Sequence, residues 1–338
     1  ADTTITNAYQ ANLTTRGTAS NMGRADSLEV FSIYAQESSG SSELSRILIK
    51  FDTTKIAADR TSGVIPASGS VNFVLRMYNA VTPFTVPRDF TLVATAVSGA
   101  RQNAGASIAF SWQEGNGIDL DNYTDVTRNG IGANWMNMGS SSALGIIKWG
   151  NQSAASAGGV YYDEPGKSTF TQTFEVGTED LEIDVTPLVE QWVNSGGNVL
   201  GSKENYGLGI HLTSSQEVYV AAADASTTVP ANTAGSKRSY YDKKFFARSS
   251  EFFFKRPVIE ARWDSATKDD RGNFFYSSSL ATANENLNTI YLYNYFRGQL
   301  RNIPSIGTNP IHVTIYSGSS DNTGPSTEAL TLVADGTH

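Results

Sequence analysis

Cysteine is absent from the 338 residues of this chain, and histidine occurs only at His211, His312 and His338. Disulfides, thiolate metal sites and thiol nucleophiles are therefore excluded. Three histidines, one of them at the last position, also argue against a zinc site built on three imidazoles. From this composition we expect no cofactor.

Charge is scarce as well, because Asp, Glu, Lys and Arg make up only 17% of the chain. The 25 basic and 33 acidic side chains leave a net charge of −8, which counts against capture of nucleic-acid phosphates. No apolar run approaches the roughly 18 residues of a membrane-spanning helix. We therefore expect neither nucleic acid nor a membrane as a partner.

The most frequent pattern in the sequence is an alternation of apolar and polar residues. In the segment VNFVLRMY, for example, Val71, Phe73, Leu75 and Met77 fall on one face. Similar strand-like segments occur at 28–34, 45–51, 71–78, 90–97, 181–185, 206–212, 217–222 and 258–263. Many short strands with turn-rich connections predict an all-β fold, an antiparallel jelly-roll β-sandwich.

One helix is expected within this sandwich. Thr186 supplies a capping hydroxyl and Pro187 suits the first helical position, where its missing N–H would have no partner. Leu188 and Trp192 lie four residues apart and form an apolar stripe. The glycines at 196–197 end the pattern, so the helix has about two turns.

The domain organisation follows from changes in composition. Residues 1–263 form the sandwich, with a long insertion at about 98–160 that is rich in Gly, Asn and Ser. The polar stretch DSATKDDRG after Trp263 resembles a linker. Beyond it, 264–338 is expected to be a small β-rich domain that serves as an interaction or assembly segment.

Several of these segments occur in an order known from one family. The pieces are ADTTI at 1–5, SRILIKFD at 45–52, LRMY at 75–78, WQEG at 112–115 with Trp135 after it, IDVTPLVEQW at 183–192, NYGL at 205–208 and RPVIE at 256–260. Together they resemble the DNRLRE-type β-sandwich domains of surface-attached bacterial proteins, and similar modules occur in phage virion proteins. The resemblance implies a structural or adhesive module without catalytic residues to transfer.

A calcium site is one chemical possibility in the insertion. Asp119, Asp121 and Asp125 in GIDLDNYTD place carboxylates at spacings that suit Ca²⁺ ligation. The central Gly and distal Glu of an EF-hand loop are missing from this stretch. A solvated acidic loop is the competing interpretation.

The aromatic residues of the insertion suggest a sugar-binding platform. Tyr123, Trp135 and Trp149 could present flat faces to sugar rings, or they could pack the insertion onto the sandwich. Other aromatic clusters, at 240–241, 245–246 and 252–254, suggest burial at a subunit interface, where Tyr and Phe are enriched.

Catalysis is the third possibility. A glycoside hydrolase needs two carboxyl groups, for which Glu114, Asp163 and Glu164 are candidates beside aromatic loops. His211 alternates with apolar neighbours in an expected strand, so it fits a residue on the face of a sheet better than a catalytic base.

These features favour a non-enzymatic structural protein of a phage virion, such as a capsid-decorating, fibre or tail component. Its expected partners are other virion protein subunits and further copies of itself as a homo-oligomer, and its expected location is the virion. The alternative is a carbohydrate-binding or adhesive module of a secreted or surface bacterial protein, with surface glycans as partner and an extracellular or cell-surface location.

Overall fold

The chain divides into two compact units, Ala1–Asp264 and Ser265–His338. This division lies one residue beyond the one expected from the sequence. The computed structural model describes residues 1–34, 41–82, 86–103, 106–121, 132–141, 145–150, 156–193 and 202–264 of the first unit, and 280, 282, 293–297, 299–301, 316–318 and 325–329 of the second.

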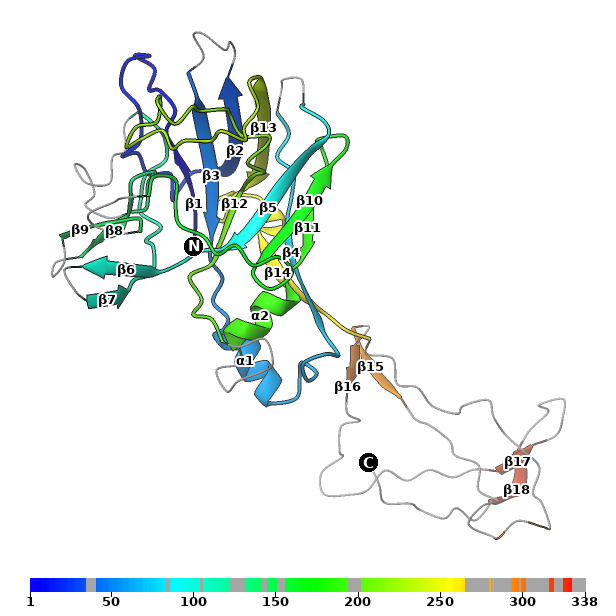
Figure 1. The fold of residues 1–338 in the computed structure, drawn as a ribbon. Helices are drawn as coiled ribbons and strands as arrows, with labels where there is room; N and C mark the ends of the chain where they lie inside the picture. Colours follow the sequence, from blue (N-terminus) through cyan, green and yellow to red (C-terminus); the bar gives the residue numbers. More distant parts are fainter. Residues whose placement is uncertain are drawn as a thin grey trace. The chain divides into compact units, whose positions relative to one another are not determined.

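Strands are the predominant secondary structure of the first unit (Figure 1). They are β1 (Asp2–Thr6), β2 (Ser27–Tyr34), β3 (Glu43–Ile49), β4 (Asn72–Met77), β5 (Phe90–Ala96), β6 (Ala100–Asn103), β7 (Ala106–Ala109), β8 (Asn137–Ser141), β9 (Gly145–Lys148), β10 (Thr169–Phe174), β11 (Leu181–Asp184), β12 (Leu208–Leu212), β13 (Ser239–Phe246) and β14 (Val258–Arg262). The helices among its described residues are α1 (Thr54–Thr61), α2 (Thr186–Val193) and the 3₁₀ turn η2 (Phe253–Lys255).

Two antiparallel sheets form the body of this unit. The larger sheet has seven strands in the order β10-β5-β12-β3-β2-β13, with β1 also paired to β3. The smaller sheet has the order β11-β4-β14. Hairpins β6–β7 and β8–β9 stand apart from both sheets. The fold class expected from the sequence, an all-β antiparallel sandwich, is therefore confirmed.

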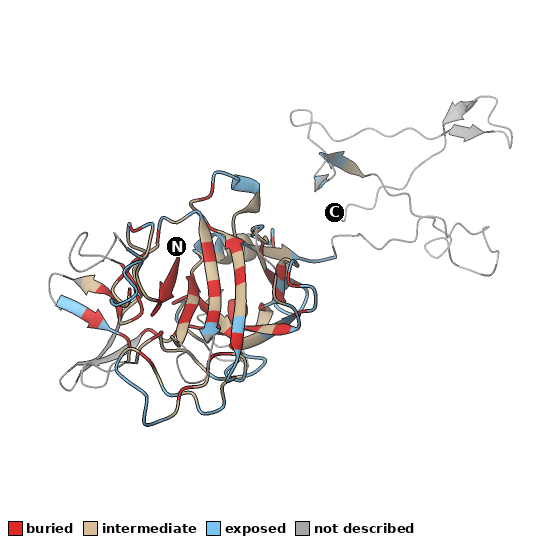
Figure 2. Cartoon of the chain, turned by 90° about the horizontal axis from the view of Figure 1, so that it is seen from above, coloured by how far each residue is buried: buried red, intermediate tan, exposed pale blue. Residues whose placement is uncertain are grey.

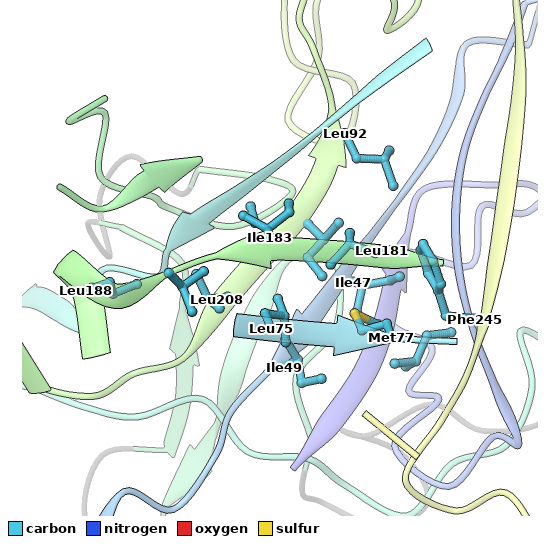
Figure 3. Packing of buried hydrophobic residues seen from close by; sticks show 14 of the residues in the cluster. Ile47, Ile49, Leu75, Met77, Leu92, Leu181, Ile183, Leu188, Leu208 and Phe245 are labelled. Carbon is cyan, nitrogen blue, oxygen red and sulfur yellow. The ribbon is translucent and has the colours of Figure 1, made fainter. Parts of the chain in front are cut away.

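The main core lies between the two sheets. Figure 3 shows Leu75 of β4 and Ile183 of β11 in one cluster with Ile47 of β3, Leu92 of β5 and Leu208 of β12. These side chains come from alternate positions of their strands, as the period of two requires. Figure 2 shows the same alternation as buried residues spaced along the strands.

A second core covers the other face of the large sheet. On β3, Ile47 and Ile49 belong to the main core, whereas Leu48 between them belongs to the second cluster. That cluster also contains Ile5 of β1 and side chains of the 98–160 insertion. Strand β3 is therefore buried on both faces, which explains its nearly continuous apolar sequence RILI.

The helix expected near residue 186 is present as α2, with eight residues. Its cap differs from the expected one: Asp184 Oδ1 accepts a hydrogen bond from the Thr186 N–H at 2.9 Å, while the Thr186 hydroxyl accepts one from the Phe73 N–H at 2.7 Å. The threonine therefore fastens the helix to β4. In this way α2 delivers Leu188 and Val189 to the core.

The expectation of a single helix was wrong, because α1 follows β3. Asp52 Oδ1 accepts a hydrogen bond from the Thr54 N–H at 2.9 Å, so the turn that follows β3 leads directly into this helix. None of the residues of α1 is buried, so no apolar stripe marked it in the sequence. No helix in the described part of the chain is long and apolar enough to cross a membrane.

The described parts of the second unit are two hairpins. Strand β15 (Asn294–Phe296) pairs with β16 (Gln299–Arg301), and β17 (Tyr316–Gly318) pairs with β18 (Pro325–Ala329). Both pairings are antiparallel.

A buried lysine fastens one end of the sandwich. The Nζ of Lys243 in β13 donates hydrogen bonds to Asn79 Oδ1 at 2.7 Å, to the Gly177 carbonyl at 2.8 Å and to the Glu179 carbonyl at 2.7 Å. Burial lowers its pKa to about 8. The three acceptors belong to the connections after β4 and β10, so this single side chain ties β13 to both.

We predict that Lys243→Met destabilises the first unit by about 2–4 kcal/mol, because it leaves buried carbonyl oxygens without a donor. Urea unfolding at pH 7 measures the change. The matched control is Lys55→Met, which removes an exposed ion pair with Asp59 on α1 and should change stability by less than about 0.5 kcal/mol. Equal effects of the two substitutions would contradict the fastening role.

Candidate functional site

The two tryptophans proposed as a sugar platform are buried. Trp135 and Trp149 both have 0% exposure and belong to the second core. Their indole N–H groups donate to the carbonyls of Thr228 and Asn134, each at 2.8 Å. Neither ring offers a face to a sugar, so the platform prediction is wrong for these residues, and packing of the insertion explains them. Tyr123 lies outside the described residues.

The aspartates proposed as calcium ligands accept hydrogen bonds from backbone N–H groups, one in their own loop and one in the segment around residue 11. Asp119 Oδ1 accepts from the Asp121 N–H at 3.0 Å, and Asp121 Oδ1 accepts from the Ala11 N–H at 2.9 Å. Asp125 lies outside the described residues. Within the described ranges, no group of three His, Cys, Asp or Glu side chains is arranged to hold a metal ion.

The candidate carboxylates for glycoside hydrolysis differ in their surroundings. Glu114 accepts two hydrogen bonds from Arg248, at 3.0 and 2.8 Å. The hydrogen bond from Lys203 lowers the pKa of Glu164, whereas a general acid requires a raised one. Asp163 is exposed. The surroundings of Glu114 and Glu164 suit ion pairing.

A charged cluster lies beneath the insertion, on the outer face of the large sheet. Arg46 of β3 donates from Nε and Nη2 to the carboxylate of Glu217, at 3.1 and 2.9 Å, and from Nη1 to the Gly158 carbonyl at 2.9 Å. The ring of Tyr161 lies beside it, with its centroid 5.8 Å from the guanidinium carbon. Through these contacts, the charged cluster joins β3 to the segments that contain Gly158 and Glu217.

His211 of β12 belongs to the same cluster. Its ring centroid lies 5.4 Å from that of Tyr161. Burial lowers the pKa of His211, and burial also raises the pKa of Tyr161 to about 12. Both side chains are therefore neutral at pH 7. They pack against Arg46 and fill space between the sheet and the insertion.

An exposed cluster of phenylalanines follows β13. Phe252, Phe253 and Phe254 are 43%, 75% and 61% exposed, although large apolar side chains are normally buried. Phe252 meets the ring of Phe246 edge-on at 5.5 Å, and Lys255 Nζ lies 4.8 Å from the centroid of the Phe246 ring. We call residues 252–254 the Phe cluster.

Hydrogen bonds hold the Phe cluster on a defined backbone. The side chain of Arg256 donates twice to the Ser250 carbonyl, at 3.0 and 2.8 Å, and the Ser250 hydroxyl accepts from the Phe252 N–H at 3.2 Å. Just before it, the Arg248 N–H donates to Asp2 Oδ2 at 2.6 Å. These bonds keep the rings at the surface on an ordered turn.

A second surface lies on β2 and β13. Glu29 and Lys244 are directly opposite each other and form an ion pair at 3.0 Å. Burial raises the pKa of Asp242 to about 7, and the negative charge of Glu29 adds to this effect. The Oδ1 atom of Asp242 is buried and has no hydrogen-bond partner.

Comparison with known proteins gives no assignment. No protein-family model matches the chain, and no curated protein matches it.

Sequence reasoning found the Phe cluster and Tyr240 as interface candidates, but it missed the ion pair between Arg46 and Glu217. These two residues are 171 positions apart, and nothing in the local pattern links them. A lone arginine in the strand segment RILI was the only available signal.

We predict that Arg46→Met destabilises the first unit by roughly 3–5 kcal/mol, because it leaves the Glu217 carboxylate buried without a cation. Arg46→Met/Glu217→Gln should recover part of that loss. Tryptophan fluorescence during urea unfolding reports on the buried indoles. Arg248→Met breaks a half-exposed Arg–Glu pair and serves as control, with an expected loss of about 1 kcal/mol or less. A loss for Arg46→Met as small as this would refute the assignment.

Asp242 gives a pH-dependent prediction. Between about pH 4 and pH 7 its carboxyl is ionised in the unfolded chain but protonated in the folded one, so its contribution to stability falls as pH rises. An amide side chain at this position cannot titrate. Asp242→Asn should therefore be more stable than the wild type at pH 8 by about 1–2 kcal/mol, a value reduced because the Asp242 side chain is partly exposed. This difference in stability should become smaller toward pH 4. Urea unfolding of dilute protein at both pH values measures it, and a constant difference would contradict the raised pKa.

Proposed function

We propose that this chain is a non-enzymatic structural protein of a phage virion that acts through contacts with other protein subunits. The observation that carries the proposal is the Phe cluster, in which three consecutive large apolar side chains stand at the surface on an ordered turn. Aromatic residues are enriched in protein interfaces, where burial of their rings drives association.

The size of the Phe cluster supports this role. At roughly 150–250 Å² for each aromatic side chain, these exposed fractions leave about 300–400 Å² of apolar surface in contact with water. Patches of this size on a folded unit commonly mark interaction sites. Burying this area would contribute roughly 7–10 kcal/mol before the entropy of association is subtracted.

The body that carries the cluster fits a structural role. Its buried charges are used internally: Arg46 binds Glu217, Lys243 binds backbone carbonyls, and both carboxylate oxygens of Glu190 accept from Arg60. Contacts of this kind hold the parts of a scaffold together.

The resemblance to DNRLRE-type sandwiches supports the virion assignment by analogy. The best-matching segment, 183–192, spans β11 and α2, which both contribute to the main core. A protein partner is favoured over a glycan because Trp135 and Trp149 are buried.

The virion assignment predicts that mass spectrometry of purified particles, from cells that carry the gene, recovers this chain in amounts comparable to other particle proteins. Protease treatment of intact particles would then show whether it lies outside. Particles that consistently lack the chain would contradict the assignment.

The Phe cluster should mediate binding to the particle. Phe253→Ser/Phe254→Ser is expected to weaken binding of purified chain to particles made without it at least about 10-fold, because two exposed aromatic anchors are lost. Leu13→Ser/Val64→Ser removes two equally exposed apolar side chains elsewhere and should leave binding unchanged. Wild-type binding by the Phe253→Ser/Phe254→Ser protein would rule out this surface.

A further inference from the structure

The side chains of Lys243 and Asn79 bring an amine and a carboxamide into contact inside the first unit. The Nζ of Lys243 donates to Asn79 Oδ1 at 2.7 Å, although the two residues are 164 positions apart. The Asn79 Cγ atom lies one C=O bond of about 1.23 Å beyond that oxygen, so it is within about 4 Å of Nζ. This separation is close to the roughly 3–3.5 Å from which a nucleophile attacks.

Backbone hydrogen bonds hold the asparagine in this position. Residues 78 and 80, on either side of it, are bonded to the backbone of β13 at 3.1 and 3.0 Å. The Asn79 N–H itself donates to Asp180 Oδ1 at 2.8 Å. The segment is therefore fixed along β13, and the two side chains meet without a large rearrangement.

The surroundings of Lys243 favour its neutral, nucleophilic form. The residue is 2% exposed, and Nζ lies 4.9 and 5.2 Å from the centroids of the buried Phe174 and Phe245 rings, which exclude water. Its three acceptors are uncharged oxygen atoms. An ammonium is costly to bury in this way. Burial accordingly lowers the pKa of Lys243 to about 8, so roughly a tenth of these side chains are neutral at pH 7.

The same three contacts direct the neutral amine toward Asn79. A neutral amine has two N–H bonds and one lone pair. The carbonyls of Gly177 and Glu179, at 2.8 and 2.7 Å from Nζ, can accept the two hydrogens. The lone pair then takes the remaining direction, which is that of the Asn79 carboxamide.

Glu179 also provides a carboxylate that can accept a proton. Its Oε1 atom accepts a hydrogen bond from the Val176 N–H at 2.7 Å. Its Oε2 atom is buried and has no hydrogen-bond partner in the described part of the chain. Burial lowers the pKa of Lys243, and the negative charge of Glu179 opposes this effect, so the two side chains interact. Glu179 therefore offers an acceptor for a proton from Nζ.

We propose that Lys243 and Asn79 react in the folded chain to form an intramolecular amide bond between Nζ and Cγ, with release of ammonia. Nζ attacks Cγ and forms the new C–N bond. Glu179 accepts one proton from Nζ and returns it to Nδ2, after which the Cγ–Nδ2 bond breaks and ammonia leaves. One amine and one carboxamide thus give one secondary amide and ammonia, without an oxidant or a cofactor.

The bond would join the two sheets of the sandwich covalently. Asn79 follows β4 of the small sheet, and Lys243 lies in β13 of the large sheet. Because the cross-link closes a loop of 164 residues, it would restrict the unfolded chain and so stabilise the folded one. The reaction occurs once within one chain and without turnover, and it does not depend on the virion role proposed above.

Mass spectrometry of the whole chain tests this proposal. The wild-type chain is purified and kept at pH 8, where about half of the Lys243 side chains are neutral before reaction. After denaturation it should be lighter than its sequence by one ammonia molecule. Proteolysis should then release one branched peptide that contains both residue 79 and residue 243. A wild-type chain that yields no such peptide would overturn the proposal.

Variants assign the bond to its two residues. Asn79→Leu removes the carboxamide at similar size and Lys243→Met removes the amine, so both chains should keep the full mass of their sequences. Lys244→Met is the matched control, because it changes the neighbouring lysine on the opposite face of β13, and it should still lose ammonia. Circular dichroism verifies that each variant is folded. A branched peptide at residue 243 in Asn79→Leu would overturn the assignment.

Glu179→Gln tests the proton transfer. A positioned general base contributes about 100-fold or more, so this variant should form the bond at least about 10-fold more slowly in mass spectra recorded at intervals after cell-free synthesis. A rate equal to that of the wild type would overturn the role of Glu179. Because bond formation is measured on the isolated chain, the particle experiments above decide the virion role independently.

Discussion

The large sheet is buried on both of its faces, and the other features of the first unit depend on this constraint. One face packs against the small sheet and α2, and the other must be covered by the long insertion. Because β3 alternates between the two cores, Leu48 and Arg46 point toward the insertion. The arginine could be accommodated there only with a buried acid, and Glu217 provides it. The insertion is thus a second layer of the structure.

The same constraint explains which aromatic residues are buried and which stay exposed. The tryptophans of the insertion are used to cover the sheet, and their indole nitrogens are bonded to backbone carbonyls. Aromatic side chains that lie beyond the covered area, in the Phe cluster and at Tyr240, stay exposed. Exposed aromatic surfaces therefore lie at the margin of the sandwich, on and after β13.

Local signals predicted much of the fold. Period-two alternation identified strands such as β4 and β12, and the Thr186-Pro187 pair located α2. The exposed helix α1 was missed because it lacks an apolar stripe, and the exact cap of α2 was missed because Thr186 bonds to β4, which is distant in sequence. For the candidate site, the sequence revealed the clusters of Phe and Tyr, but it could not predict which of these side chains are exposed.

Composition and periodicity by themselves determined the absence of thiol chemistry, the all-strand architecture and the division near residue 264. These properties depend on residue types and on neighbours within a few positions. Only the tertiary structure decided which face of each strand meets which layer, and hence that Trp135 is buried while Phe253 is exposed. It also brought Arg46 to Glu217 and placed β13 at the end of the large sheet. Burial and ion pairing at these positions depend on contacts between segments that are distant in sequence. A local sequence pattern does not reveal such contacts.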